Sequence, residues 1–331
     1  MSDLPTWQKE PGARVWPSRP LDDWKVQGPG IVERAGGGFR LFYTAVGPDK
    51  PFPTCQGYIL SAVSDDGLDF RVEPGIRQAP RPDLPHLARR ALVPSIIACG
   101  DGGWRMYFEA RGSAEIPAVV CSATSRDQVN WDYEGICLEG GHGYGGPRAL
   151  TLPDGRVRLY ACDRGTRGVA SAVSDDGASF EIEPGERMAI ATADFAPSSI
   201  TAAQVFAPQQ AGTPWTMYFS QWQDVPPGTE VPLHPVFDPD MEASENFAAA
   251  SIASDMAGYR SRIYCATSND GLEWLRGPCV IDGAGYGGEG MDAVHAEDMS
   301  IIRLADGRLR MYYATCDRDG NWGVASAVSA S

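Results

Sequence analysis

One strand pattern recurs five times along the chain, and this repetition limits the fold more than any other feature. The first recurring element is a strand that carries an aromatic pair or its equivalent. Its five copies are Phe39–Ala45, Trp104–Arg111, Val157–Asp163, Trp215–Gln221 and Leu309–Cys316. Evenly spaced similar strands are typical of radial or stacked repeat folds, so we expect five similar units.

A second element, a strand of small residues with a tight turn, follows each copy of the first. Its copies are 61–70, 121–131, 171–180 and 265–274, with a shortened copy at 326–331. Asp-Gly between apolar residues indicates such a turn, because glycine tolerates a positive φ. We expect the turn aspartates to be structural, since their side chains can bond the turn backbone. They are Asp66, Asp127, Asp176 and Asp270.

A third element precedes each copy of the first and completes a four-stranded unit. Four of its copies begin at Pro29, Pro94, Pro147 and Met299, each thirteen residues before an aromatic of the next strand. The copy at Pro197 has a longer hairpin. Each unit therefore reads as strands A to D, joined by short turns.

The two ends of the chain complement each other. The last unit stops at 326–331 without a D strand, while Trp7–Gly12 resembles the D strands Phe70–Gly75 and Phe180–Gly185. We therefore predict an all-β, single-domain protein over 1–331: a five-bladed β-propeller with four-stranded blades, closed by the N-terminal strand. A linear solenoid would use capping repeats instead, and the units are too short for an array of immunoglobulin-like sandwiches.

Composition excludes some partners. The formal net charge of −15 argues against a nucleic-acid partner or an anionic membrane surface, and no apolar run reaches the roughly 18 residues of a membrane span. The eight cysteines are scattered and form no Cys-x-x-Cys pair, and the N-terminus does not resemble a signal peptide. These features favour a cytoplasmic protein with reduced thiols.

In a propeller, the starts of the A strands and the ends of the B strands surround the axis. The candidate catalytic carboxylates there are Asp298, Glu297, Glu109 and Asp163. The candidate ligand-binding residues are Arg90, Arg111, His142, Tyr144, Arg148, Arg164, Gln221, Trp222, His295, Asp317 and Arg318. Such a set suits a polar, hydroxyl-bearing small molecule, and arginines can clamp an anionic group. Alternatively, Asp163–Arg164 and Asp317–Arg318 only form ion pairs that line a wet channel.

Two features leave alternatives open. All four histidines fall in segments of this face, and imidazole suits iron, zinc or copper, but none shows a helical metal-ligand spacing. We expect no cofactor and leave a bound metal ion open. The long segment at about 223–259, inside the fourth unit, is either a lid over the site or a subunit contact through which the protein would oligomerise.

The strands ending in Met-Tyr-Tyr or Met-Tyr-Phe and the turn at 268–274 resemble those of five-bladed propeller glycosidases and related phosphorylases. That group includes arabinofuranosidase/xylosidase, fructan-hydrolase and mannoside-phosphorylase families. The resemblance covers nearly the whole chain and implies a carbohydrate ligand on the axis. It also implies acidic residues at the starts of inner strands. The thirteen-residue register places Gly28, Val93, Gly146, Ala196 and Asp298 there, and only Asp298 is acidic.

Glycosyl transfer to water or phosphate needs two carboxyl groups, one protonated and one ionised. We nominate Asp298 or Glu297 with Glu109, and Asp163 in reserve. The sequence thus favours a glycoside-active enzyme, hydrolytic or otherwise glycosyl-transferring, that acts on a small carbohydrate, with anionic sugars among the candidates. The missing inner-strand acids keep two alternatives open. One is a lyase, isomerase or biosynthetic enzyme, metal-dependent or not, and the other is a non-catalytic carbohydrate-binding propeller.

Overall fold

A computed structural model describes residues 5–23, 25–47, 56–113, 115–190, 197–210, 212–224, 228–230 and 259–330. These residues form twenty β-strands and one 3₁₀ turn, η1 (Pro85–Leu87). The fold is therefore all-β, as predicted. No helix among the described residues is long and apolar enough to cross a membrane.

The strands form five antiparallel groups of four, each in the predicted A-to-D order. Group one is β2 (Lys25–Glu33), β3 (Phe39–Val46), β4 (Gly57–Ser64) and β5 (Arg71–Val72). Group two is β6 (Arg90–Ala98), β7 (Trp104–Arg111), β8 (Val119–Ser125) and β9 (Asp132–Leu138). Group three is β10 (Tyr144–Thr151), β11 (Val157–Asp163), β12 (Val169–Ser174) and β13 (Glu181–Ile182).

The remaining two groups contain the chain ends and the long segment. Group four is β14 (Pro197–Phe206), β15 (Trp215–Asp224), β16 (Tyr259–Ser268) and β17 (Trp274–Ile281). Group five is β18 (His295–Arg303), β19 (Leu309–Cys316), β20 (Trp322–Ser329) and β1 (Trp7–Val15). The segment predicted at 223–259 lies largely outside the described residues, and Asp224 pairs with Tyr259 where the two strands border it.

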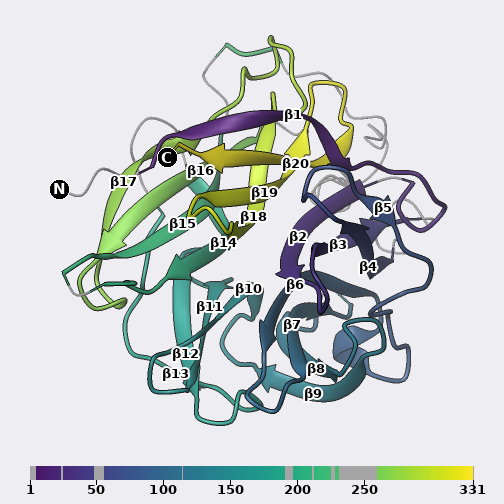
Figure 1. Cartoon of the computed structure of the whole chain (residues 1–331), viewed down its shortest axis with the longest axis vertical. Helices are drawn as coiled ribbons and strands as arrows, with labels where there is room; N and C mark the ends of the chain where they lie inside the picture. Colours follow the sequence, from purple (N-terminus) through teal and green to yellow (C-terminus); the bar gives the residue numbers. More distant parts are fainter. Residues whose placement is uncertain are drawn as a thin grey trace.

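The N-terminal strand pairs with the C-terminal strand, as the sequence predicts. β1 runs antiparallel to β20, with Trp7 opposite Ser329 and Glu10 opposite Ser326. The first strands of the groups contact one another in the order β2–β6, β6–β10, β10–β14, β14–β18 and β18–β2. Figure 1 shows the groups arranged around a common centre. The architecture is therefore propeller-like, with the first strands innermost.

An edge-to-face aromatic pair fills each junction between neighbouring groups. Each pair joins the second strand of one group to an aromatic at the start of the last strand of the next, with ring centroids 5.4–6.4 Å apart. The pairs are Phe42–Trp131, Tyr107–Phe180, Tyr160–Trp274, Tyr218–Trp7 and Tyr312–Phe70. This repeated packing explains the recurrence of aromatics in the sequence, because such pairs add to the free energy of burial.

Most of the junction tyrosines also bond the neighbouring turn. The hydroxyls of Tyr107, Tyr160 and Tyr312 donate to turn-glycine carbonyl oxygens at 2.8–3.0 Å. The chain ends replace this turn in group five, and the buried Tyr218 hydroxyl finds no hydrogen-bond acceptor among the described residues. A cavity of about 670 Å³ lies at this junction, bordered by Tyr218 and Ser329.

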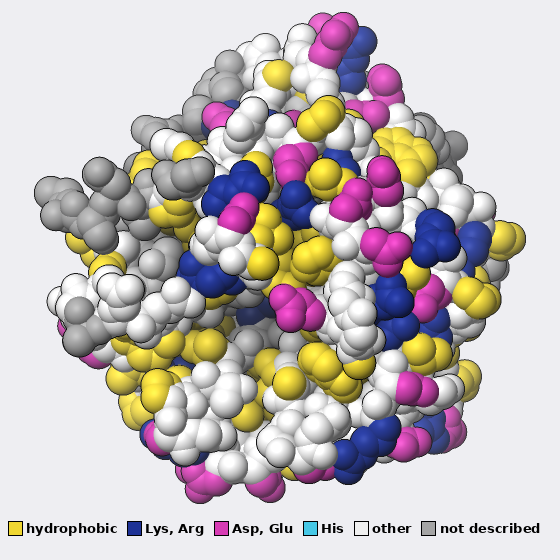
Figure 2. All heavy atoms as spheres, in the orientation of Figure 1, with side chains coloured by type: hydrophobic (Ala, Val, Ile, Leu, Met, Phe, Trp, Pro, Cys, Tyr) yellow, Lys and Arg dark blue, Asp and Glu magenta, His cyan; other side chains and the backbone are white. Residues whose placement is uncertain are grey.

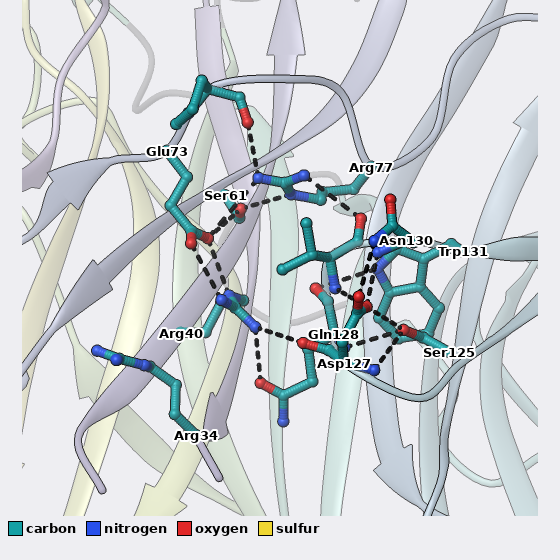
Figure 3. A network of polar contacts seen from close by, with 12 residues as sticks. Arg34, Arg40, Ser61, Glu73, Arg77, Ser125, Asp127, Gln128, Asn130 and Trp131 are labelled. Atoms are coloured by element: carbon teal, nitrogen blue, oxygen red, sulfur yellow. Dashed lines mark hydrogen bonds and ion pairs between the residues drawn. The ribbon is translucent and has the colours of Figure 1, made fainter. Parts of the chain in front are cut away.

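The turn aspartates are structural, as predicted. Asp127 accepts hydrogen bonds from the backbone N–H groups of Val129 and Asn130, both at 2.8 Å. Backbone N–H groups likewise lower the pKa of Asp66 to about 2. Figure 3 shows how Arg40 joins this turn to group one: its guanidinium donates to the Asp127 carbonyl at 3.1 Å and forms an ion pair with Glu73.

Lysine and arginine side chains are interspersed with aspartate and glutamate on the face shown in Figure 2, and this face is hollowed near its centre. The side chains drawn in colour there do not form a continuous basic patch.

Candidate active site

The first strands share a left-handed bulge at the position that the thirteen-residue register aligns. Gly28, Val93, Gly146 and Asp298 have φ of 54°, 50°, 55° and 50°, and the pairing register of each strand shifts there. Ala196, the fifth position, lies outside the described residues. A positive φ costs a residue with a side chain about 1–2 kcal/mol, so Asp298 is held in a strained conformation. Such strain is typical of functional positions.

Asp298 is nearly fully buried, with only 5% of its surface exposed. Burial raises the pKa of its carboxyl, and the charges of Arg148 and Lys25 and a hydrogen bond from Thr201 only partly oppose that effect. These three residues come from β10, β2 and β14, so strands of several groups converge on this carboxyl. Among the described residues, its Oδ1 atom has no hydrogen-bond partner. A carboxyl that stays protonated to a higher pH than usual suits a general acid.

Arg148 connects the first strands of several groups through hydrogen bonds near this carboxyl. Its side chain is buried, and its five hydrogen bonds of 2.9–3.3 Å all go to backbone carbonyl oxygens. The acceptors are Pro29, Pro94, Pro147, Asp298 and Met299. Burial lowers its pKa to about 10, which keeps it charged at neutral pH. Because a guanidinium has five N–H groups, we assign Arg148 to the framework rather than to the predicted ligand contacts.

Glu109 holds two arginines from neighbouring groups. Its Oε1 accepts from Arg111 Nε at 2.5 Å and from Arg164 Nη2 at 2.9 Å, and its Oε2 accepts from the Gly146 N–H at 2.8 Å. Burial alone would raise its pKa, but the two arginines and the N–H group together lower it to about 2. Glu109 is therefore ionised, which suits a residue that positions the arginines and not a general acid.

Residues at the position of Glu109 in other groups have a structural role that needs no charge. Thr44 and Ser220 occupy the same place on β3 and β15, where their hydroxyls accept from the bulge N–H groups of Val93 and Asp298 at 2.8 and 3.0 Å. Glu109 does the same for the next bulge and also binds the arginines. A hydroxyl suffices as acceptor in groups one and four, and group five has Ala314 at this place, so the repeat does not explain an ionised carboxylate here.

Glu297 lies beside an aromatic stack in the same part of group five. The Trp222 indole N–H donates to its carboxylate, and His295 Nδ1 lies 4.0 Å from Oε2. The His295 ring stacks on Trp322 at 5.2 Å, and the ammonium of Lys25 lies 3.7 Å from the centre of the Trp322 ring. Lys25 and Trp322 are not among the site residues predicted from the sequence, although Lys25 begins an A strand, where ligand-facing residues are expected.

Three other predicted residues lie close to the two arginines. Arg90 is buried opposite Arg111 in the strand register, and Tyr144 is buried opposite Asp163. Asp163 bonds the N–H of Gly165 at 2.7 Å and thereby caps a turn. The structure thus brings these residues together, although Asp163 also has a structural task.

The remaining predicted residues have local or external partners. Gln221 accepts a hydrogen bond from Arg276 at 3.0 Å, and Asp317 caps its own turn through the N–H groups of Asp319 and Asn321. His142 and Arg318 are exposed. Among the ion pairs of the described residues, Arg164 pairs with Glu109 and not with its sequence neighbour Asp163.

The described part of the chain contains no cluster of three histidine, cysteine, aspartate or glutamate side chains that could hold a metal ion. His86 bonds the Tyr133 hydroxyl at 2.9 Å, and His295 contacts Ser261. His234 lies outside the described residues, so a metal site that includes it stays a prediction.

Glu109→Gln should destabilise the protein at neutral pH. A folded-state pKa of about 2 instead of the ordinary 4.5 corresponds to about 3 kcal/mol. This stabilisation is complete above pH 4.5 and disappears as the pH falls towards 2, because the depressed pKa favours the ionised form. Urea unfolding of both proteins between pH 3 and 7 measures it.

The matched control is Glu134→Gln, which removes the surface ion pair with Arg105. It should cost less than about 1 kcal/mol. An equal loss in both variants, or a loss for Glu109→Gln that does not shrink in acid, would contradict the assignment of Glu109 as a buried, ionised anchor.

Comparison of the sequence with known proteins finds no matching family model and no matching curated protein. Comparison of the structure finds β-1,2-mannobiose phosphorylase from Listeria innocua, with a TM-score of 0.67, 14% identity and coverage of 98% of this chain and 96% of that one. A second is a GH130-family structure, from work on glycoside hydrolases that target β-1,2 mannosidic linkages in Candida mannan (TM-score 0.66, 14% identity, 98% and 94% covered). A third is a thermostable family-43 glycoside hydrolase (TM-score 0.58, 13% identity, 92% and 88% covered). The chain thus has the propeller-like fold of glycoside hydrolases and mannoside phosphorylases, the group that its repeats resemble.

Proposed function

We propose that the protein is a glycoside-active enzyme that binds a small carbohydrate on the axis of a closed, five-bladed propeller, with Asp298 as its general acid. One observation carries this proposal: Asp298 is the acidic residue at the aligned bulge, it is strained and buried, and its pKa is raised. A protonated carboxyl in this position can donate to the oxygen of a glycosidic bond.

The five groups correspond in this proposal to five blades. The pairing of β1 with β20 and the contacts between β18 and β2 support a closed ring. Closure would bring the starts of β2, β6, β10 and β18 to one axial site.

The proposed reaction needs a proton donor, Asp298, and a nucleophile, either water or phosphate. As the glycosidic C–O bond breaks, its electron pair goes to the leaving oxygen, which takes the proton of Asp298. The nucleophile then forms a bond to the anomeric carbon. In hydrolysis Glu297 would accept the proton of the attacking water, and the proton balance closes when Glu297 releases this proton to solvent and Asp298 takes one up. In phosphorolysis a phosphate oxygen would attack directly, and Asp298 alone would be reprotonated from solvent.

Arg111 and Arg164 would bind an anionic group of the substrate, or phosphate, near this bond. Each uses part of its guanidinium on Glu109, and their side chains remain 34% and 32% exposed. Two arginines at a fixed spacing can hold a phosphate or a sugar carboxylate through paired N–H groups. The substrate class would therefore be an anionic sugar, or a neutral sugar with phosphate as acceptor.

The test is a panel of glycosides, including mannosides and uronides, incubated with and without inorganic phosphate. Release of sugar that requires phosphate would establish phosphorolysis, and release without it would establish hydrolysis. Ligands are also tested by thermal shift. A sugar that raises the melting temperature without any product formation would overturn the enzymatic proposal in favour of a binding protein.

A further inference from the structure

We propose that Gly145 is a positioning residue for the two arginines that would bind the anionic group. Because this position has no side chain, Glu109 can extend to Arg164 and hold it beside Arg111. Gly145 lies on β10, Glu109 and Arg111 lie on β7, and Arg164 directly follows β11. The inference rests on the proposed binding of an anion by these arginines and identifies what sets their spacing.

The repeat does not require glycine at this position. Gly145 is the residue before the left-handed bulge of group three, and the residues before the other described bulges are Gln27, Leu92 and Glu297. The strand register agrees with this alignment, since each of the four residues is paired with the second strand of its own group. The aligned strands thus have a side chain where β10 has none.

The backbone conformation of Gly145 does not require glycine either. Its φ is not positive, whereas its neighbours Gly143 and Gly146 have φ of 99° and 55°. A residue with a side chain adopts a strand conformation of negative φ without strain. The remaining reason for glycine is the space beside it.

This space is occupied by the ion pair between Glu109 and Arg164. A Cβ atom added to Gly145 would overlap Glu109 Oε2 and Arg164 Nη2, and it would lie 2.7 Å from Glu109 Cδ. The overlapping atoms are the ends of two side chains and not backbone atoms. A methyl group at this position would therefore displace the ion pair while the strand stays in place.

Glu109 makes the two guanidinium groups converge on one carboxylate. Its Oε1 accepts from Arg111 Nε at 2.5 Å and from Arg164 Nη2 at 2.9 Å, and the Gly146 N–H fixes its Oε2 at 2.8 Å. Among the described residues, the other side-chain nitrogens of the two arginines make no hydrogen bond, and both side chains are partly exposed. These nitrogens can therefore donate to an external ligand.

The charges of this cluster favour an oxyanion as the ligand. Two guanidinium groups face one ionised carboxylate, which leaves one excess positive charge. Paired N–H groups at a fixed spacing match two oxygens of a phosphate group or of a sugar carboxylate. Without the contact to Glu109, the two cations would repel each other and lose this spacing.

The first experiment measures the binding of inorganic phosphate and of glucuronate by isothermal titration calorimetry. Phosphate binding would point to phosphate as the acceptor, and glucuronate binding to an anionic sugar. Gly145→Ala should raise the Kd of the bound anion at least about tenfold, because displaced arginines lose their common geometry. Binding of neither anion to the wild type would overturn the inference.

The matched control is Gly287→Ala. Gly287 belongs to a second Tyr-Gly-Gly sequence, at 286–288, and a Cβ atom added to it would meet no atom within 4 Å. This variant should keep the Kd within about twofold of the wild type. An equal loss of affinity in Gly145→Ala and Gly287→Ala would contradict the positioning role.

The second experiment tests whether Gly145→Ala acts through Glu109. Glu109→Asp shortens the side chain by one methylene group and withdraws its carboxylate from position 145. In this background, Gly145→Ala should raise the Kd by no more than about twofold. If Gly145→Ala alone is too unstable for titration, recovery of its melting temperature by Glu109→Asp tests the same contact. Losses of equal size in both backgrounds would refute the inference.

The outcomes separate this inference from the proposed function. If Gly145→Ala loses anion binding as expected but the wild type turns over no glycoside, the positioning role stands and the glycoside-active function is wrong. If the wild type turns over a glycoside and Gly145→Ala changes neither the Kd of either anion nor KM, the function stands and the positioning role is wrong.

Discussion

Asp298→Asn is expected to lower turnover by a factor of about 100 to 10,000, the contribution of a general acid. The substitution keeps the shape of the side chain, and asparagine tolerates the positive φ of 50° at this bulge. The protein should therefore fold normally and lose only its proton donor. Initial rates on the best substrate of the glycoside panel, at saturating concentration, measure the effect.

The same substitution should stabilise the protein near neutral pH. Burial raises the folded-state pKa of Asp298 above its ordinary value of 3.8, so the folded protein loses stability as the pH rises through the interval between the two pKa values. The variant lacks this loss. Its melting temperature should thus match the wild type near pH 3 and exceed it at pH 7.

The control is Asp66→Asn, in a structural turn outside the candidate site. It should lower the melting temperature and keep the activity. Full turnover of Asp298→Asn would disprove its assignment as general acid, and a melting temperature below the wild type at pH 7 would disprove the raised pKa.

Arg148→Met is expected to have the largest effect on stability. The change leaves five carbonyl oxygens of the inner strands without their donor, and each unsatisfied buried group costs about 1–3 kcal/mol. We expect a loss of at least about 5 kcal/mol or failure to fold. Urea unfolding by intrinsic fluorescence measures this loss.

Two variants accompany this test. Arg148→Lys keeps a cation with three N–H groups and should recover part of the loss. Arg318→Met, at an exposed position, should leave the unfolding free energy nearly unchanged. An Arg148→Met protein as stable as the wild type would show that the inner strands do not depend on this guanidinium.

The fold could be predicted from the sequence because its determinants are local and repeated. Asp-Gly turns and aromatic strands fix each hairpin within a few residues, and the similarity of Trp7–Gly12 to the other D strands predicts the observed pairing of β1 with β20. The thirteen-residue register aligned Gly28, Val93, Gly146 and Asp298, and the structure shows a left-handed conformation at each of them. A repeated sequence pattern predicts the strands and turns of each unit even when the long-range contacts are unknown.

The site was less predictable because its chemistry depends on contacts between different groups. The sequence named Glu109 and Arg148, but it could not show that one is an ionised anchor and the other a framework residue. Those roles depend in large part on distant partners, such as Gly146, 37 positions from Glu109, and Met299, 151 positions from Arg148. Thr201 gave no signal, since the hairpin of β14 is longer than the others and falls outside the common register.

The junction between groups four and five has a consequence for how the molecule comes apart. The Tyr218 hydroxyl has no acceptor there among the described residues, and a cavity adjoins it. No turn joins the last two strands of group five, whose ladder ends beside this site with a hydrogen bond from the Ala330 N–H to the Thr6 carbonyl oxygen. Local opening requires the least free energy where backbone and packing constraints are fewest. Separation of β1 from β20 should therefore need less free energy than separation of the last two strands of the other groups, which a turn connects, and a fusion tag at either terminus would lie beside this site.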